Sequence, residues 1–199
     1  MSTSRGRRPG APDTRAEILA AARTLFASRG FSATTIRAVA TDAGVDPALV
    51  HHYFGAKDDL FLAALELSVD PRDVLLPVVA GGVDGAAERL LRAIIGVWDD
   101  PSTRLALVGL LRGTLEPGGA RLVGGGFVPV VIGPVGEALG IDHAEVRMPL
   151  VVSQVIGLLM CRYVLELEPI ARMPVETVVA TYAPTLQRYL TGDLPGLDA

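Results

Sequence analysis

Apolar side chains recur every three to four residues along most of this 199-residue chain, and this spacing constrains the fold more than any other feature. In the first such stretch, one helix face would carry Ile18, Leu19, Ala22, Leu25 and Phe26, and Asp13 or Thr14 is placed to cap the helix. Similar patterns, bounded by capping residues, Gly or Pro, return as far as residue 190. We find no convincing strand pair and no hairpin turn, so the sequence predicts an all-α fold.

Two short helices are expected close together, from Ile36 to Ala43 and from Pro47 to Phe54. Thr34 or Thr35 is placed to cap the first, and Asp46 the second. A helix of about two turns is not stable alone in water, so the second must be held by packing. The side chains suited to that packing are Val45, Leu49, Val50 and Phe54. This is the layout of a helix-turn-helix motif.

The opposite face of the second short helix then points outward and carries Ala48, His51, His52 and Tyr53. Small and hydrogen-bonding side chains on such a helix suit the DNA major groove, which admits one helix. Donors at the edge of the motif suit phosphate contacts. The candidate DNA-binding residues are therefore Thr35, Arg37, Ala48, His51, His52, Tyr53 and Lys57.

Charge is divided unevenly along the chain. Residues 1–57 carry eight basic and four acidic side chains, whereas residues 58–199 carry ten basic and eighteen acidic ones, for a formal net charge of −4 overall. A basic N-terminal segment on an acidic body favours contact between that segment and a polyanion. The alternative is a basic tail on an ordinary acidic protein.

The order and spacing of several motifs resemble the N-terminal domain of the TetR (tetracycline repressor-like) family over about residues 14–62. These motifs are Gly30-Phe31, Thr34-Thr35-Ile36, Ala43-Gly44-Val45, His52-Tyr53-Phe54 and Lys57-Asp58-Asp59-Leu60. The resemblance implies a three-helix DNA-binding domain followed by a helical ligand-binding and dimerising domain. It also implies DNA contacts at Thr35, Ala48, His52, Tyr53 and Lys57. His51 and Ala48 depart from the frequent Tyr and Gly, which leaves the operator sequence open.

We expect a basic arm over residues 1–12, a DNA-binding domain over 13–58 and a helical body over 59–199. Residues 70–85 read as a connection with a short helical piece, and residues 120–140 as an irregular helix.

The last two helices, about 150–167 and 175–190, have wide apolar stripes that one chain would leave partly uncovered. The resemblance implies that they form the contact of a homodimer, which binds a near-palindromic operator. The ending and the use of seventeen Arg against one Lys resemble actinobacterial members of the family.

Some side chains of the body are candidates for lining a ligand pocket, with ordinary core packing as the alternative for each. They are Trp98, Arg104, Phe127, Met148, Met160 and Cys161. Arg162 lies in an otherwise apolar helix, where it could pair with an acid or meet a ligand.

Several kinds of site are not expected. The single cysteine, Cys161, excludes a disulfide framework within the chain, and His51 and His52 point about 100° apart on a helix, which does not suit a metal site. No catalytic set or phosphate-cradling loop is recognised, so we expect neither an enzyme nor a cofactor. The longest uncharged runs, 15 and 14 residues, are shorter than a membrane span, so a cytoplasmic protein is expected.

The sequence thus predicts a dimeric DNA-binding transcriptional regulator, a repressor released from its operator by a small molecule. Two alternatives stay open: a ligand-independent or architectural DNA-binding protein, and a helical small-molecule binder or enzyme. Repression and activation are not distinguished, and the effector is not identified.

Overall fold

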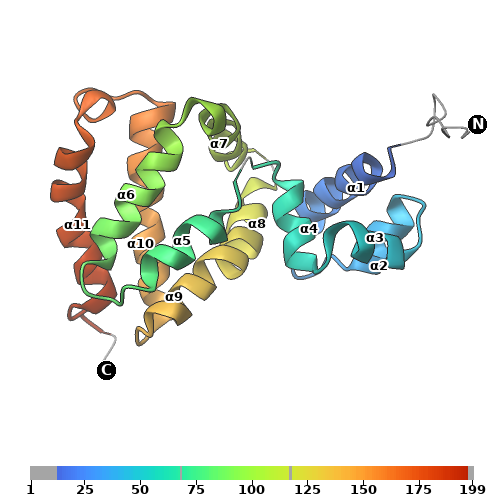
Figure 1. Ribbon diagram of the computed structural model, residues 1–199, viewed down its shortest axis with the longest axis horizontal. Coiled ribbons are helices and arrows are strands. Elements are labelled where there is room, and N and C mark those ends of the chain that lie inside the picture. Colours follow the sequence, from blue (N-terminus) through green and yellow to red (C-terminus); the bar gives the residue numbers. More distant parts are fainter. Residues whose placement is uncertain (1–12, 68, 117, 197–199) are drawn as a thin grey trace, which may run out of the picture. The chain divides into compact units, whose positions relative to one another are not determined.

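The computed structural model describes residues 13–67, 69–116 and 118–196, so the expected arm over residues 1–12 lies outside the described part. Within these ranges the regular structure is helical and no strand occurs, which confirms the all-α prediction. The chain divides into two compact units, Met1–Leu65 and Glu66–Ala199, referred to below as the N-terminal and C-terminal units (Figure 1).

The N-terminal unit contains α1 (Thr14–Arg29), α2 (Ile36–Asp42), α3 (Pro47–Phe54) and α4 (Lys57–Ala64). The expected caps are in place, because the side chains of Asp13, Thr35 and Asp46 accept hydrogen bonds from backbone N–H groups in the first turns of α1, α2 and α3. Gly30 and Gly55 follow α1 and α3 with φ of 82° and 75°. These local signals fix where the short helices begin and end.

An aromatic cluster of Phe26, Phe31 and Phe61 fills the centre of this unit, with ring centroids 5.2 to 5.9 Å apart. Thr34 is fully buried beside it and donates its hydroxyl to the carbonyl oxygens of Gly30 (2.8 Å) and Leu25 (3.2 Å). Because Phe61 belongs to α4 and α4 packs on α1, the division of the chain falls after Leu65. The boundary expected after residue 58 lies in the first turn of α4.

The C-terminal unit is a bundle in which α6 packs against both α5 and α11, and α10 packs against α11 (Figure 1). Its elements are α5 (Pro71–Val79), α6 (Ala86–Asp99), α7 (Pro101–Gly113), α8 (Gly119–Leu122), the π-helix η1 (Val123–Ile132), α9 (Gly133–Leu139), α10 (Ala144–Leu159), the π-helix η2 (Met160–Val164), the 3-10 turn η3 (Ile170–Arg172) and α11 (Val175–Thr191).

Two regions that were difficult to interpret from the sequence are helical. The short helical piece expected within residues 70–85 is α5, which Asp70 caps and which buries Leu75 and Val79. The irregular helix expected over residues 120–140 is α8, η1 and α9, with Pro129 inside the wider turns of η1. A proline has no N–H to donate, and a change of helical pitch accommodates that loss.

Two helical stretches, Gly119–Leu139 and Ala144–Val164, are 21 residues long and apolar enough to cross a membrane by length and composition alone. Counting uncharged runs missed them, because the helices continue past charged residues such as Glu137 and Arg147. In the structure both pack within the C-terminal unit, α9 against α5 and α10 against α11. Core helices of helical domains also have this length and composition, so the two stretches are only weak evidence for a membrane span.

Candidate functional site

The exposed face of α3 is the first candidate site. Val50 and Phe54, 0% and 8% exposed, hold the helix against the core of the N-terminal unit, while Tyr53 is 44% exposed. Ala48, His51 and His52 are also exposed. The helix therefore presents the four side chains that the sequence analysis assigned to its outward face.

The two histidines of α3 have different surroundings. The Nδ1 atom of His51 lies 2.9 Å from the carbonyl oxygen of Gly55, so this ring turns back to the end of its own helix. The ring of His52 packs edge-on against Tyr53, with centroids 5.6 Å apart. Among the described residues, no group of three His, Cys, Asp or Glu side chains could hold a metal ion.

Three of the candidate phosphate contacts, Thr35, Arg37 and Lys57, lie at helix starts. Thr35 caps α2 and is exposed, as is Arg37 in the first turn of that helix. Lys57 begins α4; its Nζ atom lies 4.2 Å from the ring centroid of Phe31 and donates to the carbonyl oxygen of Ser32 at 3.5 Å. Partial burial lowers the pKa of Lys57, and Asp58 offsets this in part. Lys57 is thus oriented by contacts within the unit.

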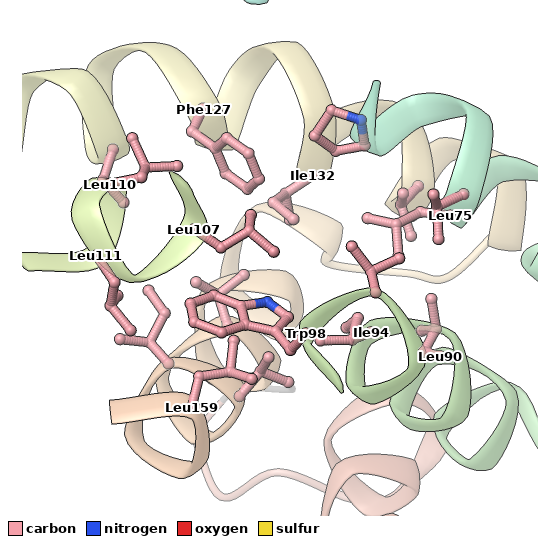
Figure 2. Close-up of a pocket in the computed structure, with 18 of the residues that line it drawn as sticks. Leu75, Leu90, Ile94, Trp98, Leu107, Leu110, Leu111, Phe127, Ile132 and Leu159 are labelled. Carbon is pink, nitrogen blue, oxygen red and sulfur yellow. The ribbon is translucent and has the colours of Figure 1, made fainter. Parts of the chain in front are cut away.

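The second candidate site is an apolar cavity of about 190 Å³ in the C-terminal unit (Figure 2). Trp98, Phe127 and Met148, three of the six residues proposed from the sequence, line it. The other lining residues are Leu67, Val69, Pro71, Val74, Leu75, Leu90, Ile94, Val97, Leu107, Leu110, Leu111, Thr114, Val123, Ile132, Val135, Val151, Val152, Val155, Ile156 and Leu159. None of these residues is charged, so the cavity suits an uncharged, mostly hydrocarbon molecule.

Arg104, Met160 and Cys161 are not among the lining residues. Arg104 is exposed and donates to the carbonyl oxygens of Trp98 (3.1 Å) and Asp99 (2.9 Å). Met160 packs on the cluster that contains Trp98, and Cys161 is half-buried. The structure therefore brings together only the aromatic and Met148 part of the expected set.

Arg162, whose partner the sequence left open, is buried and donates to the carbonyl oxygens of Ile170 (2.8 Å) and Met173 (2.7 Å). It therefore fastens η2 to the turn that precedes α11. This contact is structural and lies outside the cavity.

The apolar stripe of α11 faces inward. Val178, Val179, Leu186 and Leu190 are 0 to 2% exposed, and α11 packs on α6. Both α6 and α10 cover this part of the stripe, whereas Tyr182 and Tyr189, which belong to the same stripe, are only half-buried. The outer faces of α10 and α11 instead expose mostly small or short side chains, among them Pro149, Ser153, Gly157, Ala180, Thr181, Pro184 and Thr185.

Comparison with known proteins matches both units. The family described as "Bacterial regulatory proteins, tetR family" matches residues 18–64, and "Tetracyclin repressor-like, C-terminal domain" matches residues 84–190. A crystal structure of a TetR-family regulator from Streptomyces coelicolor A3 is 41% identical, with a TM-score of 0.50 over 93% of this chain and 98% of that one.

Two curated relatives match over shorter stretches. The HTH-type transcriptional regulator HbdR of Aromatoleum sp. is 34% identical over 82 residues, 41% of this chain. The HTH-type transcriptional regulator BetI of Brucella anthropi is 34% identical over 102 residues, 44% of this chain. The chain spans 36% and 52% of the lengths of these two relatives. The family match, which covers both units, shows that the chain belongs to the TetR family of helix-turn-helix transcriptional regulators.

Proposed function

We propose that the protein binds duplex DNA by placing α3 in the major groove. The observation that carries this proposal is the outward face of α3, which exposes Ala48, His51, His52 and Tyr53 while Val50 and Phe54 anchor the opposite face. The methyl group of Ala48 suits contact with a thymine methyl, and the imidazole of His52 suits a hydrogen bond to a base edge.

Phosphate contacts at the rim of the motif would position α3. Thr35, Arg37, Tyr53 and Lys57 supply hydroxyl, guanidinium, phenol and ammonium donors there. The contacts of Lys57 with Phe31 and Ser32 orient its ammonium group before DNA arrives, which reduces the side-chain entropy lost on binding.

We further propose a homodimer through the outer faces of α10 and α11. Small side chains on these faces allow two helix pairs to approach closely. A two-fold dimer would set two α3 helices about one DNA turn apart, roughly 34–36 Å, and so would require a near-palindromic operator. Binding to chromosomal DNA places the proposed action in the cytoplasm.

The apolar cavity is the proposed effector site. An effector releases the DNA only if it binds the DNA-incompetent state more tightly than the competent one. The protein would thus act as a ligand-responsive repressor through binding, without catalysing a reaction.

Fluorescence anisotropy with duplex DNA from upstream of the protein's own coding sequence tests the proposal. We expect the wild type to bind with an affinity that falls steeply as salt rises, because phosphate contacts release counterions. The double variant Tyr53→Phe/Lys57→Gln should bind about tenfold more weakly or worse. The variant Arg172→Gln, which removes an 88% exposed cation from the C-terminal unit, serves as the control and should bind normally. Salt-insensitive binding, or no binding to any fragment, would refute the proposal.

A further inference from the structure

Trp98 lies at the boundary between the cavity and the core of the C-terminal unit. It is 8% exposed, and its ring centroid lies 5.2 Å from that of Tyr163. The hydroxyl of Tyr163 donates to Asp99 at 2.9 Å, which holds the aromatic pair at the end of α6. Trp98 itself lines the cavity, where Figure 2 draws its indole nitrogen on the ring edge that faces Leu107 and Ile132.

The indole N–H of Trp98 makes no hydrogen bond with any residue that the structure describes. The side chains that Figure 2 labels around it, such as Leu107, Ile132 and Ile94, are aliphatic and have no acceptor. Buried tryptophans usually find an acceptor for this group. An unpaired donor directed into a cavity therefore indicates that a molecule bound there would supply a hydrogen-bond acceptor.

Thr114 is another polar side chain of the lining, and its hydroxyl already donates to the carbonyl oxygen of Leu111 at 2.7 Å. Because none of the lining residues is charged, an ammonium or carboxylate group would enter without a counter-charge. The indole N–H of Trp98 is thus the main polar group of the cavity that is still free to make a hydrogen bond.

We propose that the effector is a neutral, mostly hydrocarbon molecule with a hydrogen-bond acceptor, such as a ketone or ether oxygen, that accepts from Nε1 of Trp98. This inference rests on the proposed function, in which the cavity is the effector site. It adds that the cavity discriminates between molecules of the same shape by the presence of one acceptor. A hydrocarbon leaves the indole N–H unpaired, whereas the ketone satisfies it.

The probes for the test are tetralin and 1-tetralone, two rigid bicyclic molecules that differ by one carbonyl. Isothermal titration would measure both affinities for the wild type and for Trp98→Phe, which keeps an aromatic ring against Tyr163 but removes the donor. The preference for the ketone over the hydrocarbon should be about five- to tenfold larger in the wild type. Taking the ratio of the two preferences cancels the different hydration of the probes.

Trp98 is the sole tryptophan of the chain, so the wild type has one indole N–H resonance. We expect 1-tetralone to move this proton downfield and tetralin to leave it nearly in place. This measurement does not depend on the stability of a variant. The control Tyr189→Phe removes a ring hydroxyl from α11, outside the lining, and should keep the wild-type preference.

The outcomes separate the inference from the proposed function. If both probes bind but the preference is the same in the wild type and Trp98→Phe, or the indole proton responds equally to both, the acceptor inference is overturned and the effector cavity stands. If neither probe binds the wild type, the inference fails together with the proposed effector cavity. The DNA titration tests the proposed DNA binding independently of both results.

Discussion

Replacing Arg37 by Gln should remove a phosphate contact. DNA binding should therefore become weaker and less dependent on salt concentration. Arg37 is exposed in the first turn of α2, two residues after the cap Thr35, where the proposal places a phosphate. Each neutralised phosphate adds about 0.9 to the slope of log affinity against log salt concentration on B-form DNA. A dimer with this substitution loses two such contacts, so the slope should fall in magnitude by about 1.8.

Anisotropy titrations over about 50–200 mM salt would give this slope for the wild type and the variant. Arg29→Gln is the matched control, because it removes an equal charge from the same unit at the exposed C-terminal end of α1, where no contact is proposed. We expect the control to keep the wild-type slope. Parallel slopes for Arg37→Gln and the wild type, or an equal change in Arg29→Gln, would refute the assignment of Arg37 as a phosphate contact.

Three further predictions concern stability and the cavity. Thr34→Val should lower the free energy of unfolding by about 1–2 kcal/mol in urea titrations, because two carbonyl oxygens lose a buried donor; an unchanged midpoint would contradict this. Burial raises the pKa of Tyr163 to about 12. The stabilisation from its neutral phenol is therefore complete below the unfolded pKa of about 10 and is lost as the pH rises through the folded value, so Tyr163→Phe should lose less stability than the wild type between about pH 9 and 12. Ile94→Trp should fill part of the 190 Å³ cavity and weaken tetralin binding about tenfold or more by isothermal titration, with DNA binding retained.

The N-terminal unit could be predicted closely because its helix limits depend on local chemistry. Asp13, Thr35 and Asp46 cap the helices that the sequence assigned to them. The outward face of α3 followed from the same reasoning, since burying Val50 and Phe54 leaves the opposite side exposed. Contacts across the unit were beyond such reasoning, and the position of Lys57 over Phe31 joins residues 26 positions apart.

The C-terminal unit was harder to predict because aliphatic residues at helical spacing look alike in a core, at an interface and around a cavity. Leu75 and Ile94 line the cavity but gave no signal that separated them from core residues, whereas Trp98 and Phe127 were among the candidates. How much of the α11 stripe is buried could not be predicted, because it depends on α6, more than 70 residues earlier in the chain. Whether an aliphatic residue lies in the core, at an interface or around the cavity depends on packing between distant helices. The periodicity of the sequence carries no information about that packing.

Selection of bound sequences from a pool of random duplex DNA tests sequence reading by α3 and the two-fold dimer in one experiment. We expect enrichment of an inverted repeat whose half-site centres lie about 10 base pairs, or a multiple of one helical turn, apart. Retention of no duplex at low salt, or of duplexes that share no common symmetric sequence, would contradict it.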